Sequence, residues 1–233
     1  MKFPSWIVML VLVTGCSAQE PPSSPTAGAV STTQPASSAV PSAAASVTQT
    51  APSASVAQAA SAPAPALNAE GLGKGDMAVD FSGEVVYGGS GKLSLSTFVG
   101  SKASQKKDGA IVAFGASWCG RCRESLATLK TLQAENKGLQ IVYVGTDKDE
   151  AGWNEEIAAF KERALNFPLV RVSDPDGLMQ VYFGNERNIP RFYLVDWEGT
   201  VVLKDTGFTE KKMGKLLPKQ VAYLMKLSAN RGS

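Results

Sequence analysis

Residues 110–122 read AIVAFGASWCGRC and place two of the chain's three cysteines, Cys119 and Cys122, three positions apart. The run 110–114 is short and wholly apolar, which is typical of a strand buried on both faces of a sheet. A stretch with leucines at helix-like spacing follows, from Cys119 to about Glu135. The cysteine pair is therefore expected at the start of a helix that follows a central strand.

The spacing of Cys119 and Cys122 favours redox chemistry over a structural role. A disulfide that closes a loop of about four residues contributes only about 2 kcal/mol to stability, against about 4.7 kcal/mol for a loop of about 100 residues. At a helix start, unpaired N–H groups and the helix dipole stabilise a thiolate, and Arg121 adds a positive charge. We expect Cys119 to attack and Cys122, one turn inward, to resolve the mixed disulfide.

Metal, cofactor and nucleic-acid chemistry find little support in the composition. The chain has no histidine, the usual ligand of catalytic zinc or copper and the usual base of a nucleophilic serine or cysteine. One CxxC pair supplies only two of the four ligands that zinc needs. The formal net charge is +2 and the basic residues are scattered, so no basic stripe indicates nucleic acid. We expect no metal, no cofactor and no nucleic-acid partner.

The N-terminus has the layout of an export signal. Residues 1–15 read MKFPSWIVMLVLVTG, with one lysine before an apolar run too short for a transmembrane helix of about 20 residues. The run Val13-Thr14-Gly15-Cys16 resembles the lipobox of bacterial lipoproteins, which implies that Cys16 carries lipid and begins the mature chain. The alternative is an ordinary signal peptide. Ser17 stands where aspartate would mark inner-membrane retention, which favours the outer membrane, so we expect a lipid anchor at the periplasmic face of a bacterial membrane.

Residues 16–70 differ in composition from the rest of the chain. They are mostly Ala, Ser, Pro, Thr and Val and contain no aromatic residue, so they cannot bury enough apolar surface to offset the entropy of ordering. We expect a disordered tether after the lipidated N-terminus, while a glycosylated stalk or a cell-wall spacer stays an open alternative. Residues 71–233 have the composition of one globular domain with a core of its own.

Strand and helix signals alternate in that domain. Strands are expected at 110–114, 139–144, 191–195 and 200–203, and helices at 119–135, 151–165, 178–183 and 210–227. We expect Ile157, Phe160 and Ala164 to face the sheet, a turn at 174–177, and a bend or restart at Pro218. The order of elements implies a parallel strand pair followed by a hairpin, and hence a three-layer α/β arrangement.

The segment FGASWCGRC resembles the active-site strand, turn and helix of the thioredoxin superfamily. Its surroundings, GDMAVDFSG, GGSGKLSLSTFVG, FPLVRVSDPDGLMQVYF and NIPRFYLVDWEGTVV, resemble the TlpA/ResA-like branch of membrane-anchored thiol-disulfide oxidoreductases. The resemblance implies a thioredoxin-like α/β/α fold with a central mixed sheet and an N-terminal β-hairpin extension. It also implies a cis bond between Ile189 and Pro190, beside the cysteines, with the Ile189 backbone holding an extended substrate and Trp118 on the exposed rim.

Two departures concern the proton acceptor for Cys122. Thioredoxins carry a buried aspartate where this chain has Ala113, and the TlpA/ResA-like branch usually has a glutamate where this chain has Ser125. Glu124 precedes this position, Ser125, by one residue, so its side chain is expected about 100° further round the helix. The candidates are Glu124 through a shifted helix, Ser125 or a water molecule; the alternatives are that reduction by this protein is slow and that Glu124 is a surface or helix-start acid. Arg121 replaces the proline common before the second cysteine, so the redox potential of relatives does not transfer.

The resulting hypothesis is an extracytoplasmic, membrane-anchored thiol-disulfide oxidoreductase that reduces protein disulfides, of the cytochrome c maturation or envelope thiol repair type. A membrane or periplasmic donor would re-reduce it. One alternative is a peroxiredoxin-like thiol peroxidase, although residues 113–118 lack the proline of that family. The other is a non-catalytic binding lipoprotein in which the cysteine pair is a small staple.

Overall fold

The computed structural model describes residues 69–232. The predicted signal segment, Cys16 and all but the last two residues of the predicted tether lie outside this range. The described part contains a seven-stranded sheet in the order β2-β1-β5-β4-β3-β6-β7. Its strands are β1 (Ser82–Tyr87), β2 (Lys92–Ser94), β3 (Gly109–Gly115), β4 (Leu139–Gly145), β5 (Leu169–Val172), β6 (Arg191–Asp196) and β7 (Val201–Thr206). Its helices are α1 (Gly120–Glu135), α2 (Glu150–Glu162), α3 (Pro175–Phe183) and α4 (Met213–Ala229), with single 3₁₀ turns η1 (Leu95–Thr97) and η2 (Asn230–Gly232).

The sheet is mixed, as expected. β3 lies parallel to β4 and antiparallel to β6, and β4 lies parallel to β5. β1 pairs antiparallel with β5 and with β2, so an N-terminal hairpin extends the sheet at one edge, and β6 and β7 form the other. The predicted α/β fold with a central mixed sheet and an N-terminal hairpin is confirmed.

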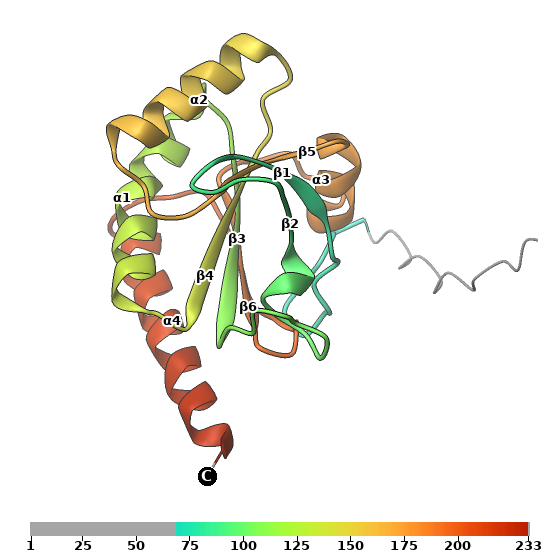
Figure 1. Cartoon of the computed structure of the whole chain (residues 1–233), viewed down its shortest axis with the longest axis vertical. Coiled ribbons are helices and arrows are strands. Elements are labelled where there is room, and N and C mark those ends of the chain that lie inside the picture. Colours follow the sequence, from blue (N-terminus) through green and yellow to red (C-terminus); the bar gives the residue numbers. More distant parts are fainter. Residues whose placement is uncertain (1–68, 233) are drawn as a thin grey trace, which may run out of the picture. The chain divides into compact units, whose positions relative to one another are not determined.

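Helices cover both faces of the sheet, which makes three layers (Figure 1). On β3, Ile111 and Ala113 face a core formed with α1, α2 and α4, while Val112 and Phe114 face a second core formed with α3 and η1. Successive side chains of a strand point to opposite faces, so a strand covered on both sides must be apolar throughout. This explains the unbroken apolar run that precedes the cysteines.

The inward face of α2 differs from the prediction. The helix ends at Glu162, and Ala164 lies outside it, exposed, with a positive φ of 46°. This left-handed residue reverses the chain so that Leu165 returns to the core. Trp153 and Glu156 are buried on α2 beside Phe160. The predicted burial of Phe160 is confirmed, and that of Ala164 is wrong.

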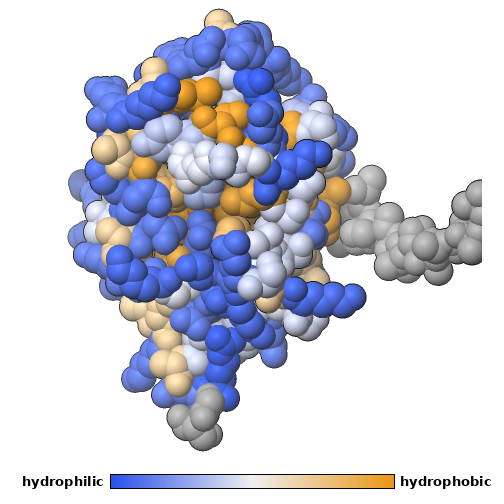
Figure 2. Space-filling view, in the orientation of Figure 1, coloured by the Kyte–Doolittle hydropathy of each residue, from blue (hydrophilic) through white to orange (hydrophobic). Residues whose placement is uncertain are grey.

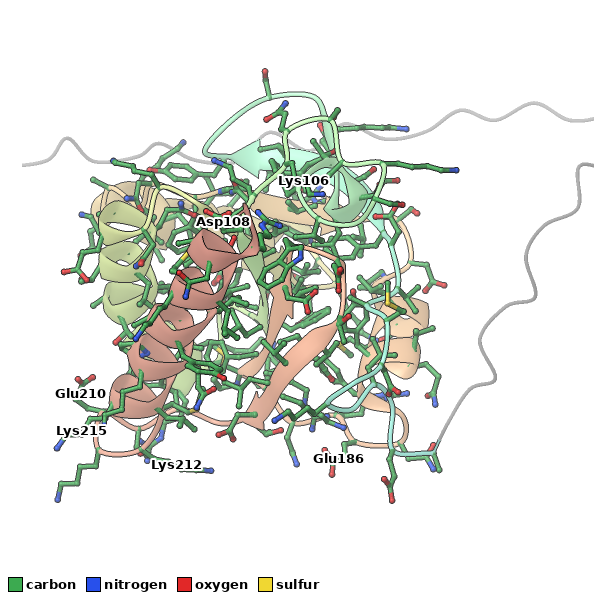
Figure 3. All side chains as sticks on the ribbon, turned by 90° about the horizontal axis from the view of Figure 1, so that it is seen from below. Lys106, Asp108, Glu186, Glu210, Lys212 and Lys215 are labelled. Carbon is green, nitrogen blue, oxygen red and sulfur yellow. A yellow bond between two sulfur atoms is a disulfide. The ribbon has the colours of Figure 1, made fainter. Side chains whose placement is uncertain are left out.

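Two further boundaries also differ. The predicted turn at 174–177 is the first turn of α3, where the Asp174 carboxylate accepts a hydrogen bond from the Gly177 N–H and Pro175 takes the first helical position. The helix α4 runs through Pro218 without a restart. Ser228, in the last turn of α4, and Arg231, in η2, donate hydrogen bonds to Asp108 just before β3. Asp108 is labelled in Figure 3.

The surface turned toward the viewer in Figure 2 is mostly hydrophilic, with hydrophobic residues showing between charged ones. Within residues 69–232, no helix is both long and apolar enough to cross a bilayer. The same residues contain no group of three His, Cys, Asp or Glu side chains placed to hold a metal ion.

Candidate active site

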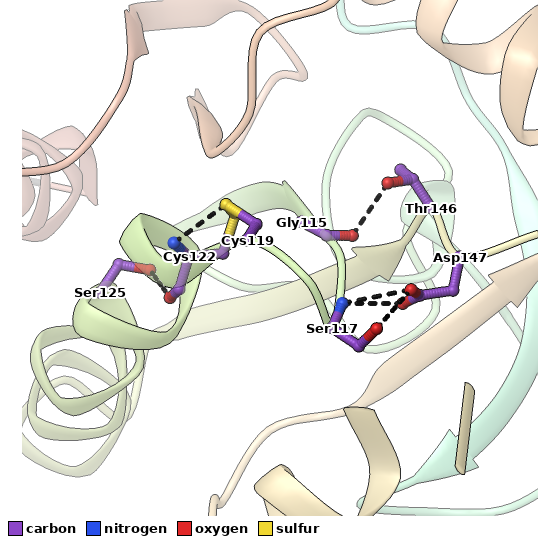
Figure 4. Close-up of a disulfide and its surroundings, with 7 residues drawn as sticks. All are labelled: Gly115, Ser117, Cys119, Cys122, Ser125, Thr146 and Asp147. Carbon is purple, nitrogen blue, oxygen red and sulfur yellow. Dashed lines mark hydrogen bonds between the residues drawn. A yellow bond between two sulfur atoms is a disulfide. The ribbon is translucent and has the colours of Figure 1, made fainter. Parts of the chain in front are cut away.

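Cys119 and Cys122 form a disulfide at the N-terminus of α1 (Figure 4). Cys119 is the N-cap residue, and its Sγ accepts a hydrogen bond from the Cys122 N–H at 3.1 Å. Cys119 is 6% exposed whereas Cys122 is fully buried. Cys119 thus keeps a small exposed fraction that Cys122 lacks, and the helix N-terminus would stabilise a thiolate at Cys119.

The loop between β3 and α1 is fastened to the end of β4. Asp147 accepts hydrogen bonds from the Ser117 backbone N–H at 3.0 Å and from the Ser117 hydroxyl at 2.8 Å. Thr146 donates from its N–H and its hydroxyl to the Gly115 carbonyl, at 2.8 and 3.0 Å. Both contacts are drawn in Figure 4. Asp147 thus holds the loop that precedes the cysteines, and the sequence analysis did not predict this. The pattern that could have indicated it is a polar residue directly after β4, the strand parallel to β3.

The predicted rim residues meet in one groove. Trp118 is 73% exposed, and Trp118 and Ile189 both line a cavity of about 760 Å³ beside the cysteine loop. Lys148, Asp149, Glu155 and Arg187 also line it, so it carries charges of both signs. The Ile189–Pro190 peptide bond is cis, as expected. The structure thus places Trp118 and Ile189 where a polypeptide substrate can reach both, while their roles stay predictions.

Arg121 and Glu124 lie on the surface of α1. Their side chains form an exposed ion pair at 3.2 Å, and Arg121 also donates to the Phe208 carbonyl at 3.4 Å. Exposed pairs of this kind contribute little to stability. The Glu124 carboxylate is engaged with Arg121 in solvent, whereas Cys122 is buried. Its role as proton acceptor stays a prediction.

Beneath Cys122, the packing is tight and includes a tyrosine hydroxyl. A Cβ atom on Gly115 would lie 1.8 Å from the Tyr143 hydroxyl oxygen and 3.1 Å from the Cys122 Cβ, so only glycine fits at this position. The Tyr143 hydroxyl and the Cys122 side chain therefore both lie close to the same side of Gly115. Ser125, also buried, donates its hydroxyl to the Cys122 carbonyl at 2.6 Å.

Glu156, from α2, is the buried acid next to Tyr143. Burial, and then the charge of Asp147, raise the pKa of Glu156 to about 7, while Tyr143 and Arg123 lower it. Burial, and then the Glu156 charge, raise the pKa of Tyr143 well above its ordinary value. The Tyr143 hydroxyl and Glu156 Oε2 are buried without a hydrogen-bond partner in the described part of the chain. Sequence reasoning missed both residues, because an acid in a helix is ordinarily assigned to the surface.

Comparison with known proteins agrees with this geometry. The thioredoxin-like family matches residues 109–201, which span β3 to the start of β7 and include both cysteines. Among the curated proteins, none matches the chain. A solved structure from Chlorobium tepidum, assigned as the thiol:disulfide interchange protein DsbE, is 26% identical, with a TM-score of 0.55 over 66% of this chain and 99% of its own.

Two further solved structures share the fold. The thioredoxin domain of a thiol-disulfide oxidoreductase from Bacteroides vulgatus is 24% identical, with a TM-score of 0.52 over 64% of this chain and 99% of its own. A protein from Bacteroides thetaiotaomicron, assigned as a protein disulfide isomerase, is 22% identical, with a TM-score of 0.54 over 66% of this chain and 91% of its own. The described domain is thus thioredoxin-like in fold and similar over residues 109–201 to the thioredoxin-like family, and the matched segment contains the Cys119–Cys122 disulfide, whose role as the redox pair stays a prediction.

Proposed function

We propose that this protein reduces disulfides of other proteins outside the cytoplasm while a lipid on Cys16 holds it to a membrane. The observation that supports the reaction is the difference between the two cysteines, because Cys119 is the N-cap of α1 and 6% exposed whereas Cys122 is fully buried one turn further in. One thiol can then meet a large substrate while the other acts only inside the domain.

The reaction proceeds in two exchanges. The Cys119 thiolate attacks one sulfur of the substrate disulfide, and the other substrate sulfur leaves as a thiolate that takes a proton from solvent. The Cys122 thiol then loses its proton, and its thiolate attacks Cys119 Sγ. The second substrate sulfur leaves, and the Cys119–Cys122 disulfide forms. Two electrons have passed to the substrate, so a dithiol donor in the membrane or periplasm must re-reduce the protein.

The groove beside Trp118 and Ile189 supports a polypeptide substrate. It lies next to the cysteine loop and is wide enough, at about 760 Å³, for several side chains. An extended segment is the shape that a strand-like backbone contact would hold. The charges along the groove would then select among such segments, as expected for a reductase of particular proteins.

The direction of electron flow is tested by measuring the redox potential of the Cys119–Cys122 pair. The full-length protein, or the isolated domain of residues 71–233, is equilibrated with glutathione or dithiothreitol buffers. Trp118 fluorescence reports the redox state of the adjacent pair. A potential near about −270 mV supports a reductase, whereas one near about −120 mV would make the protein an oxidant of folding proteins. A pair below about −300 mV that exchanges sluggishly would indicate a structural staple instead.

The anchor is tested separately on the whole chain. In a bacterial host, incorporation of labelled fatty acid into the wild-type chain and its loss in Cys16→Ala are expected, with the protein in the membrane fraction. A labelled Cys16→Ala variant would contradict lipidation at this residue. Unlabelled wild-type protein recovered from the periplasm would leave the ordinary signal peptide as the explanation of residues 1–15.

A further inference from the structure

The resolving step needs a proton acceptor inside the domain. The thiolate, and not the thiol, is the nucleophile in exchange, so Cys122 must lose its proton before it attacks Cys119. Cys122 is fully buried, and its thiol has no direct access to solvent bases. The acceptor must therefore come from the side chains packed around the inner sulfur.

The acids and hydroxyls nearest in sequence are already engaged. The Glu124 carboxylate lies in solvent against Arg121. The Ser125 hydroxyl donates to the Cys122 carbonyl. The Asp147 carboxylate accepts hydrogen bonds from the backbone N–H and the hydroxyl of Ser117. The contacts that orient these three groups therefore do not involve the Cys122 side chain.

Tyr143 and Glu156 are different because their buried polar atoms face each other and bond to no other group of the described chain. Tyr143 lies directly opposite Ala113 in the parallel register of β4 and β3, and its side chain points to the face of the sheet that α1 and α2 cover. Its hydroxyl lies close to Gly115, to the Cys122 side chain and to Glu156. A buried hydroxyl and a buried carboxylate that have no other partner in the described chain are placed to pass a proton between them.

We propose that Glu156, through the Tyr143 hydroxyl, accepts the proton of the Cys122 thiol when Cys122 resolves the mixed disulfide. The thiol donates its proton to the Tyr143 oxygen as the tyrosine O–H proton passes to the Glu156 carboxylate. The Cys122 thiolate then forms the bond to Cys119 Sγ, and the substrate sulfur leaves. The proton returns to Cys122 when a donor dithiol reduces the disulfide. This assignment rests on the dithiol function proposed above.

The electrostatic surroundings suit this role. The groups that face Glu156 are Tyr143, Asp147, Arg123 and Glu155, with Cys122 beyond Tyr143. Their combined effect and burial hold the carboxyl pKa near 7, so that it can both take and release a proton at neutral pH. Tyr143 keeps its proton at this pH, because its pKa lies well above 10, and it therefore passes protons without becoming a tyrosinate.

The test uses the reduced protein and Ellman's reagent, an aromatic disulfide that releases a coloured thiolate at each exchange. The first release reports Cys119, and the second reports attack by Cys122 on the mixed disulfide. In Glu156→Gln the second release at pH 7 should slow by roughly 100-fold, and in Tyr143→Phe by about tenfold or more, while the first release stays within about twofold. The wild-type second step should rise as pH passes through about 7, and Glu156→Gln should lose that inflection.

Controls separate this role from a structural one. Glu162→Gln, on the exposed side of α2, should leave both steps unchanged, and Glu156→Asp should recover part of the second step. Circular dichroism and thermal unfolding verify that each variant folds. A second step within about threefold of wild type in both Glu156→Gln and Tyr143→Phe would overturn the assignment. Wild-type protein whose Cys119 does not react at all would instead overturn the proposed function.

Discussion

The outer and inner sides of the Cys119–Cys122 disulfide are built from different kinds of residues. Outside, Trp118 is exposed, Arg121 and Glu124 pair in solvent, and a charged groove adjoins the loop. Inside, Cys122 is fully buried near a glycine and a tyrosine hydroxyl, and a buried carboxylate faces that hydroxyl. The outer side can exchange substrate and protons with solvent, whereas the inner side must supply its own acid–base chemistry.

The same contrast separates the two buried carboxylates. Asp147 is saturated by Ser117, and such a hydrogen-bonded carboxylate holds the loop in place. Glu156 is similarly buried but unpaired, and burial raises its pKa to about 7. Asp147 and Glu156 therefore differ in chemistry, because hydrogen-bond donors of Ser117 stabilise the charged form of Asp147 whereas burial disfavours the charged form of Glu156.

The largest expected effect is on disulfide exchange, when the outer or the inner cysteine is replaced. Cys119→Ser should abolish reaction with a disulfide substrate such as insulin, because the buried Cys122 cannot reach it. Cys122→Ser should still attack but accumulate a mixed disulfide, since no thiol resolves it. Non-reducing gel electrophoresis and mass spectrometry distinguish the two outcomes. Mixed disulfides trapped on Cys122 in the Cys119→Ser variant would contradict the assigned roles.

The next largest effect is the pH dependence of the free energy of unfolding that the Glu156 carboxyl causes. Its carboxyl pKa is about 7 in the folded protein against 4.5 as its ordinary value, so between these pH values the folded state binds more protons than the unfolded chain. The free energy of unfolding should therefore fall as pH rises from about 4.5 to about 7, by roughly 3 kcal/mol, and then level off.

Glu156→Gln should remove this contribution and be more stable than wild type above pH 7. Urea unfolding of the oxidised proteins at pH 5 and pH 8 measures the difference, with Glu162→Gln as the matched exposed control. A slope with pH that Glu156→Gln leaves unchanged would show that this carboxyl is ionised in the folded protein with an ordinary pKa.

A smaller effect is expected at Asp147. Asp147→Asn removes charge-assisted hydrogen bonds to Ser117 and should destabilise the domain by about 1–3 kcal/mol, as measured by chemical unfolding at pH 7. The same substitution removes a negative charge that raises the pKa of Glu156, so the pH-dependent fall in stability should move to lower pH. Ser117→Ala, which loses only the hydroxyl contact, should cost less.

The smallest effect on stability is expected at Trp118. Because this side chain is 73% exposed, Trp118→Ala should change the free energy of unfolding by less than about 0.5 kcal/mol. Reduction of insulin should nevertheless slow, while reaction with the small Ellman's reagent stays close to wild type. If both substrates slow equally, Trp118 affects the reactivity of the Cys119 thiol and not the binding of a polypeptide in the groove.

Local patterns explain why so much of the fold was predictable. The apolar run of β3, the leucine spacing of α1 and the hairpin residues between β6 and β7 each lie within one short segment. The CxxC spacing placed Cys119 at a helix start, and the structure shows it as the N-cap. These features depend on residues that are neighbours in the chain, so the sequence by itself determined them.

Only the tertiary structure decided which acid is buried beside Tyr143. The helical pattern of 151–165 pointed to Ile157, Phe160 and Ala164 as the inward residues, whereas α2 ends earlier and buries Glu156. Hydropathy assigns a glutamate to solvent, and it carries no information about a tyrosine on a neighbouring strand. Glu156, Tyr143 and Cys122 come from three elements, and the packing of α1 and α2 on one face of the sheet brings them together.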